Sequence, residues 1–217
     1  MKAPERIIPQ RVDTAEILRS PDLIGCYGFK PIPQTRDYTC GAAAVASVFG
    51  YYGKRSTEYD CLQSLDTNKV TGTSWYSMYK LIKEKGFKSR LWARFPTAEL
   101  IARSKEGHPT IVEWLDWGGH WVVHVGYEPR RGVLVFADPA KPRSNFTCHL
   151  VEDFERFWVA GGAREGSKIP ALAIPVDPPA AHSKGPTLIT TTPRVRHKLV
   201  YDWVTRRPWN GKVLQHA

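Results

Sequence analysis

Residues 34–44 read Gln34-Thr-Arg-Asp-Tyr-Thr-Cys40-Gly-Ala-Ala-Ala44, so one cysteine lies directly before an alanine-rich segment. The segment 42–52 combines Ala with Val, Phe and Tyr and is followed by Gly53. An apolar run of this length that stops at a glycine predicts a buried helix. The fold is therefore expected to form around this helix, with the cysteine at its start.

Cys40 lies where Asp37 or Thr39 can cap the predicted helix. A cysteine is a nucleophile only as the thiolate, and both a helix N-terminus and a neighbouring histidine favour that form. Gly41 leaves room for a substrate to approach the sulfur. Position alone also fits a merely buried thiol, so a nucleophilic role depends on a histidine from elsewhere in the chain.

A histidine and an aspartate occur at the ends of two neighbouring predicted strands. His120 opens the strand 120–127, and Asp138 follows the strand 133–137. Antiparallel neighbours place the start of one strand beside the end of the next, so the two side chains are expected to be close. The imidazole would accept the thiol proton, and the carboxylate would orient the imidazole.

Gln34 lies six residues before Cys40. Its amide could join the Cys40 backbone N–H in binding the oxyanion of a tetrahedral intermediate. Each residue alone has an ordinary explanation: a free buried cysteine, a solvated strand-end histidine, a turn-opening aspartate or an exposed loop glutamine. Together, and at these element ends, they predict thiol-dependent acyl chemistry.

The remaining pattern places helices first and an antiparallel sheet second, which is typical of an α+β fold. The other helices are predicted at 11–19, 56–65, 73–85, 97–104 and 151–158. The other strands are predicted at 87–93, 110–117 and 171–176.

The stretch around Cys40, closed by Tyr51-Tyr-Gly53, resembles the cysteine box of the C39 and C39-like peptidases. Gly119-His-Trp-Val-Val-His-Val-Gly-Tyr127 and Val135-Phe-Ala-Asp-Pro139 resemble that family's histidine and aspartate boxes. The resemblance covers roughly residues 30–176. It implies a papain-like fold with N-terminal helices packed on an antiparallel sheet. It also implies a cysteine peptidase with Cys40 as nucleophile, His120 as general base and acid, Asp138 as orienting residue and Gln34 as oxyanion donor.

Two positions depart from the family pattern. Ala42 stands where proline is frequent, and His124 stands where an apolar residue is usual. His124 shares a strand face with His120, so it either approaches the site or is a core histidine. The best-known C39 domains are fused to ABC exporters and cut leader peptides after a double glycine. This sequence shows no membrane domain, so that substrate is not expected to carry over.

Length and composition favour one soluble domain. The 217 residues are 42% apolar, and they contain no secretory signal and no apolar run of the ~20 residues that span a bilayer. We expect an N-terminal extension at 1–29, a peptidase domain at 30–177, a basic extension at 178–217 and a cytoplasmic location. The four cysteines form no C-x-x-C pair, and His120-x-x-x-His124 lies on a strand without the glutamate of a zinc helix. Neither a metal nor a cofactor is expected.

The net charge of +10 is concentrated in the C-terminal extension, which has seven Lys/Arg and one acidic residue. Six of these cations are interleaved with aromatic residues: Arg194, Arg196, Lys198, Arg206, Arg207 and Lys212. They could bind nucleic acid or an acidic partner, or form a solvated arm. The alternatives to peptide hydrolysis are an amidase or an acyl or peptidyl transferase with the same thiol, and a non-catalytic module that binds through this tail.

Overall fold

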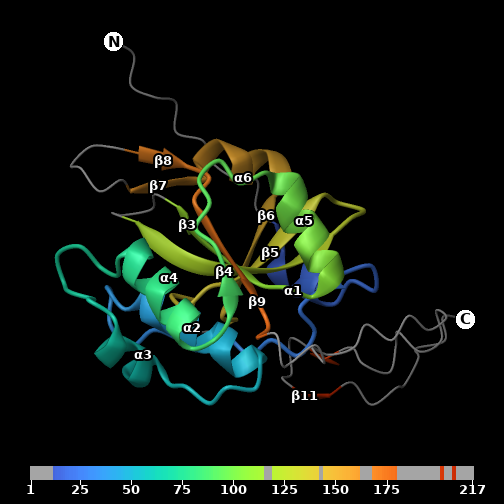
Figure 1. Cartoon of the computed structure of the whole chain (residues 1–217). Coiled ribbons are helices and arrows are strands. Elements are labelled where there is room, and N and C mark those ends of the chain that lie inside the picture. Colours follow the sequence, from blue (N-terminus) through green and yellow to red (C-terminus); the bar gives the residue numbers. More distant parts are fainter. Residues whose placement is uncertain are drawn as a thin grey trace, which may run out of the picture.

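The computed structural model describes residues 12–114, 119–141, 144–161, 168–179, 201–202 and 207–208. Over these residues an antiparallel sheet has helices on both faces (Figure 1), so the expected α+β class is confirmed. The helices are α1 (Thr14–Leu18), α2 (Cys40–Tyr51), α3 (Glu58–Ser64), α4 (Trp75–Glu84), α5 (Thr97–Glu106) and α6 (Val151–Phe157).

Helix α2 forms as expected but begins two residues earlier, at Cys40. Every residue from Cys40 to Phe49 is buried. The small side chains of its alanines let neighbouring elements approach from all sides, which is why the helix has no polar stripe. Gly53 follows with a φ of 77°, and the Lys54 N–H donates to Phe49 O, which ends the helix in the expected way.

The main sheet of the described residues has the order β2-β9-β3-β4-β5-β6, and all neighbouring strands are antiparallel. Strand β1 pairs with β4 beyond the end of β3. The strands are β1 (Ile24–Gly25), β2 (Lys88–Ser89), β3 (Thr110–Trp114), β4 (His120–Glu128), β5 (Val133–Ala137), β6 (Phe146–Leu150) and β9 (Ala173–Asp177). Two short pairs lie outside it: β7 (Val159–Gly161) with β8 (Lys168–Pro170), and β10 (Tyr201–Asp202) with β11 (Arg207–Pro208).

Residues of β4 alternate between two apolar layers. Trp121 and Val123 belong to the core cluster that contains α2, whereas Val122 belongs to the cluster that contains Leu100 of α5 and Phe154 of α6. A sheet covered on both faces has strands without polar alternation. The fully buried strands β3 and β5 show this pattern.

Several expectations about the strands need correction. Strand β6 was not expected, although Phe146 and Cys148 alternate with polar neighbours and are buried. The strand expected at 87–93 forms a regular ladder only at β2, followed by a single bridge from Trp92 to Ala173. The strand expected at 110–117 is observed as far as Trp114, and residues 115–118 lie outside the described part.

The expected division into three segments stays a prediction. In the structure, however, residues 12–29 do not stand apart, because Leu18, Leu23 and Phe29 are buried in the same core as α2. Most of the basic extension lies outside the described residues. Its binding to an acidic partner or nucleic acid therefore stays a prediction.

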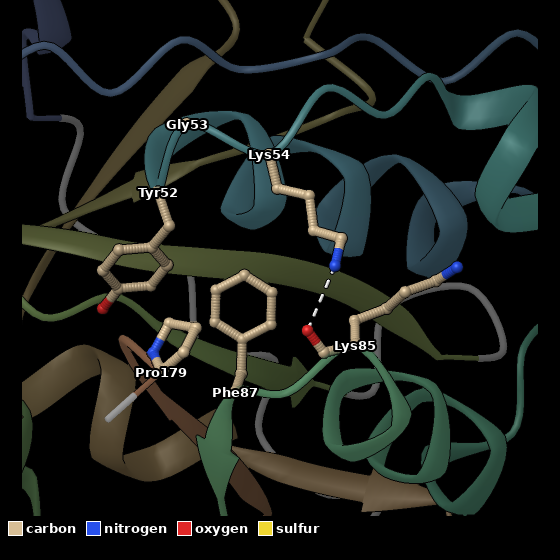
Figure 2. Close-up of a pocket in the computed structure, with 6 residues that line it drawn as sticks. All are labelled: Tyr52, Gly53, Lys54, Lys85, Phe87 and Pro179. Carbon is tan, nitrogen blue, oxygen red and sulfur yellow. Dashed lines mark hydrogen bonds between the residues drawn. The ribbon is translucent and has the colours of Figure 1, made fainter. Parts of the chain in front are cut away.

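The C-terminal end of α2 borders a cavity of about 250 Å³ (Figure 2). Tyr52 and Phe87 form its aromatic walls, and Pro179 lies beside them. The Lys54 ammonium donates to Lys85 O at 3.1 Å, as the dashed line in Figure 2 shows. Since a helix rises 1.5 Å per residue, this cavity lies about 18 Å from the start of α2.

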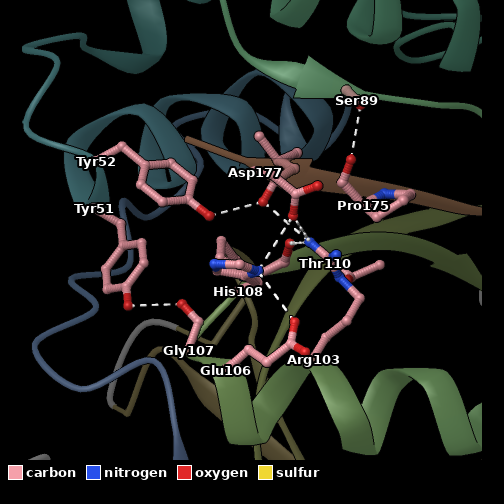
Figure 3. Close-up of polar contacts among 12 residues, drawn as sticks. Tyr51, Tyr52, Ser89, Arg103, Glu106, Gly107, His108, Thr110, Pro175 and Asp177 are labelled. Carbon is pink, nitrogen blue, oxygen red and sulfur yellow. Dashed lines mark hydrogen bonds and ion pairs between the residues drawn. The ribbon is translucent and has the colours of Figure 1, made fainter. Parts of the chain in front are cut away.

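A polar network anchors the same end of α2 to the sheet (Figure 3). Tyr52 Oη donates to Val176 O at 2.7 Å. The buried Arg103 guanidinium donates to Val176 O and to Asp177 Oδ1, and His108 Nδ1 lies 3.4 Å from the same carboxylate oxygen. These bonds hold α2, α5 and the end of β9 together.

Within the described residues, no helix is both long enough and apolar enough to cross a membrane.

Candidate active site

Cys40 is the first residue of α2 and is 5% exposed. The first N–H groups of a helix have no acceptor within it. No described side chain caps α2, because Thr39 at the N-cap donates its hydroxyl to Arg36 O at 2.9 Å instead. The expected cap by Asp37 or Thr39 is therefore missing. The backbone N–H of Cys40 and the positive end of the helix dipole stay available beside the thiol.

Gly41 has a packing role that the sequence did not predict. A Cβ atom at this position would lie 2.6 Å from Thr73 Cβ and 3.0 Å from Met78 Sδ. The Thr73 carbonyl in turn accepts the indole N–H of Trp121 at 3.1 Å. Glycine is needed here because the loop before α4 packs directly on the first turn of α2.

His120 and Asp138 meet just beyond the paired residues of β4 and β5, whose ladder ends at Val123 and Ala137. His120 Nε2 lies 2.8 Å from Asp138 Oδ1, and the Asp138 side chain is almost completely buried. The same carboxylate oxygen accepts the Ala140 N–H at 2.9 Å. Asp138 therefore opens a turn and is also hydrogen-bonded to the imidazole, so the two interpretations of Asp138 are compatible.

The pKa of the His120 imidazole is influenced by two nearby groups, Asp138 and the Cys40 thiol. Burial is the largest single influence on the pKa of His120 and lowers it. Hydrogen bonds to Asp138 and Cys40 and the charges of these two groups together outweigh burial and raise the pKa to about 9. The imidazolium is thus favoured at neutral pH, as a thiolate–imidazolium pair requires.

The residue directly before His120, Gly119, has a backbone conformation that favours glycine. Gly119 has a φ of 106°, and a Cβ there would lie 2.8 Å from Glu113 Oε1. Both facts favour glycine directly before the histidine. Trp114, the strand partner of His120, lies with its ring centroid 5.9 Å from the imidazole and limits its motion.

The raised pKa of His120 predicts that stability falls at alkaline pH. A histidine whose pKa rises from 6.5 to about 9 on folding stabilises the native state fully below pH 6.5. That contribution, about 3 kcal/mol, is lost as the pH rises through about 9. Urea unfolding of the wild type and of His120→Gln across this range should show the loss only in the wild type. Parallel pH profiles for the two proteins would contradict this assignment.

Gln34 is held next to the start of α2. Its amide Nε2 donates to Arg36 O at 2.9 Å, and Arg36 O also accepts the N–H of Thr39 at 3.2 Å. The Gln34 backbone N–H donates to Pro139 O at 3.1 Å, which connects the loop to the residue after Asp138. The loop of Gln34 thus joins the residue after Asp138 to the residues before α2, and Nε2 carries a second hydrogen besides the one that Arg36 accepts.

The structure also describes three other thiols. Cys26, Cys61 and Cys148 are buried and unpaired, and burial raises the pKa of each thiol, for Cys148 to about 12. Buried thiols of this kind are poor nucleophiles. Among the described residues, no three His, Cys, Asp or Glu side chains gather as a metal site would require.

His124 belongs to the core and not to the site. It is completely buried, its Nε2 lies 3.3 Å from Ser104 Oγ of α5, and burial lowers its pKa to about 3. The imidazole is therefore neutral at physiological pH, in agreement with the core alternative.

Sequence reasoning missed two residues that shape this site. Thr73 packs on Gly41, and Glu58 of α3 accepts the Thr35 N–H at 2.9 Å. No local sequence pattern indicates either contact, because both join residues that are more than twenty positions apart in the chain.

A thiol at a buried helix N-terminus, beside a histidine and an acid from an antiparallel sheet, defines the class of papain-like cysteine peptidases. The sequence model of the peptidase C39 family matches residues 28–160, and the chain belongs to this family. It is accordingly a cysteine-type peptidase with the papain-like α+β fold. A search of curated proteins found no match.

Solved structures support the same fold. The peptidase domain of Streptococcus ComA, a bi-functional ABC transporter involved in a quorum-sensing pathway, has 26% sequence identity and a TM-score of 0.56. The match covers 69% of this chain and 98% of that one. A C39-like peptidase from Bacillus anthracis has 16% identity and a TM-score of 0.56, over 71% and 97% of the two chains. A double glycine motif protease from an AMS/PCAT transporter, solved with its leader peptide, has 22% identity and a TM-score of 0.54, over 69% and 91%.

Proposed function

We propose that the chain hydrolyses peptide bonds with Cys40 as nucleophile, His120 as general base and acid, and Asp138 as the orienting carboxylate. Gln34 and the Cys40 N–H are the oxyanion donors. One observation carries most of this proposal. His120 uses Nε2 for Asp138 at 2.8 Å, which leaves Nδ1 for the Cys40 thiol that also contributes to its raised pKa.

The reaction follows from these positions. His120 takes the Cys40 proton, and the thiolate attacks the carbonyl carbon of a peptide bond. The Gln34 amide and the Cys40 N–H bind the resulting oxyanion. The C–N bond breaks as His120 returns the proton to the leaving amine, which leaves a thioester on Cys40. Water, deprotonated by His120, then releases a carboxylate and restores the thiol.

The proposed peptidase domain is residues 30–177. The family match at 28–160 supports it, and residues 12–29 pack on the same core. The proposed substrate is a peptide. A related fold is known with a leader peptide bound, which supports this substrate class but not a cleavage sequence.

Cleavage of a peptide library tests the proposal. The wild-type chain is incubated with proteome-derived peptides in water labelled with heavy oxygen, and the products are identified by mass spectrometry. Hydrolysis should give new C-terminal carboxylates that carry the label. Prior treatment with iodoacetamide near pH 6 should abolish cleavage, because Cys40 is the thiol expected to react and the three others are buried with raised pKa values.

Three outcomes would contradict the proposal. If cleavage continues after Cys40 is fully alkylated, the thiol is not the nucleophile. If new acyl–amine products form without the label, the same site is an acyl or peptidyl transferase. An absence of any product from a chain whose Cys40 reacts no faster than free cysteine would favour the non-catalytic binding module.

A further inference from the structure

The loop that carries Gln34 to Cys40 is fixed from two directions by groups outside it. On one side, the Gln34 N–H donates to Pro139 O, next to Asp138. On the other side, the Thr35 N–H donates to Glu58 Oε1 at 2.9 Å. Glu58 belongs to α3, which packs against α2. The backbone on both sides of the Gln34 side chain therefore has a fixed position before any substrate arrives.

Glu58 is an unusual residue within α3. It is only 6% exposed, whereas its neighbour Tyr59 is 67% exposed. It is not needed to cap the helix, because Thr57 and Asp60 form a reciprocal capping box. Burying a carboxyl group costs free energy unless hydrogen bonds compensate. The Thr35 N–H provides such a bond, so the inward orientation of Glu58 is explained by the loop and not by α3.

We propose that Glu58 is a positioning residue for the oxyanion site, and this rests on the function proposed above. By holding the Thr35 N–H, it fixes the backbone from which the Gln34 amide extends toward the start of α2. An oxyanion donor acts only when it is aimed at the place where charge develops. A displacement of about 1 Å can cost roughly 100-fold in rate, so the support of a donor matters nearly as much as the donor.

The alternative is that Glu58 only stabilises the fold by joining α3 to the loop. Two reactions of Cys40 separate the two roles. Acylation by p-nitrophenyl acetate forms a carbon–sulfur bond through a tetrahedral oxyanion and then expels p-nitrophenolate. Alkylation by iodoacetamide displaces iodide and forms no oxyanion. A loss of Gln34 positioning slows acylation alone, whereas damage to α2 or to His120 slows both.

Glu58→Met, Glu58→Gln and Glu58→Asp form the test series. Methionine removes the acceptor and keeps the volume, so acylation should slow about 10-fold while alkylation stays within about twofold of wild type. Glutamine keeps an acceptor at the same reach and should behave like wild type. Aspartate keeps the charge but shortens the reach, so it should slow acylation, and it decides the matter if the methionine variant does not fold. Glu84→Met, at an exposed and solvated position on α4, is the matched control.

Combination with Gln34→Ala shows whether Glu58 acts through Gln34. In the Gln34→Ala background, Glu58→Met should have no further effect on acylation. The inference is overturned if Glu58→Met leaves acylation unchanged, if it slows acylation and alkylation equally, or if it remains fully additive with Gln34→Ala. If Cys40 of the wild type is not acylated at all, the proposed function fails instead, so the two failures are distinguishable.

Discussion

His120→Gln is expected to lower kcat/KM for peptide cleavage by at least about 10⁴-fold. Without the imidazole, no described group beside Cys40 can take the thiol proton and later return one to the leaving amine. Glutamine keeps a polar side chain of similar size but has no basic nitrogen. Alkylation of Cys40 near pH 6 should also slow, about 10-fold or more, because the thiolate loses the imidazolium that stabilises it.

His108→Gln is the matched control for this variant. His108 is also a histidine beside carboxylates, at 3.4 Å from both Glu106 and Asp177, but it belongs to the network at the C-terminal end of α2 (Figure 3). Its replacement should leave both rates at wild-type values. If His120→Gln retains cleavage within about 10-fold of wild type, His120 is not the general base.

The proximity of His120 and Asp138 could be predicted from the sequence because it depends on local topology. Two strands joined by the short turn at Pro129–Gly132 must be antiparallel neighbours, so the start of one and the end of the other lie side by side. The position of Cys40 could be predicted for a similar reason, since the Ala-rich run and Gly53 mark both limits of α2. The helix start was wrong by two residues, which is usual for a boundary where no side chain forms a cap.

Glu58 and Gly41 show what sequence patterns do not contain. Ser56-Thr-Glu-Tyr-Asp60 indicates an acidic first turn of a helix, and in that pattern Glu58 and Asp60 are equivalent. The contact with the Thr35 N–H accounts for the inward orientation of Glu58, whereas Asp60 stays exposed as the partner of Thr57 in the capping box. The reason for Gly41 lies in Thr73, on a loop thirty residues later. Contacts between distant segments are set by the whole fold, and a single sequence has no periodicity that reports them.

Strand β6 is a different case, because its signal was present. Phe146, Cys148 and Leu150 alternate with Thr147 and His149, which is the period of a strand with one buried face. The alternation is short and contains His and Cys, which occur at both buried and exposed positions, so the pattern is weak. The pairing with β5 makes it a strand. Strand β6 lies beside the site, because Phe146 pairs with Ala137 and the Asp138 N–H donates to Asn145 O at 2.9 Å.

Gln34→Ala is expected to reduce acylation of Cys40 by about 100- to 1,000-fold, the usual effect of removing one oxyanion donor. The reason is that the Cys40 N–H alone would then face the negative charge of the tetrahedral intermediate. Alkylation by iodoacetamide should stay at the wild-type rate, because His120 and the start of α2 are unchanged. The two variants are therefore distinguished by alkylation. His120→Gln slows both reactions, and Gln34→Ala slows only the one that forms an oxyanion.

A control variant is needed to interpret the effect of Gln34→Ala on acylation. Gln63→Ala removes the same side chain from an exposed position of α3 and should leave both reactions unchanged. Gln34 also donates to Arg36 O, so its loss could disturb the loop and through it the first turn of α2. In that case alkylation would slow together with acylation, and Gln34 would be a structural residue of the loop. A selective loss of acylation has no such explanation, because only a donor aimed at the substrate distinguishes the two reactions at the same sulfur.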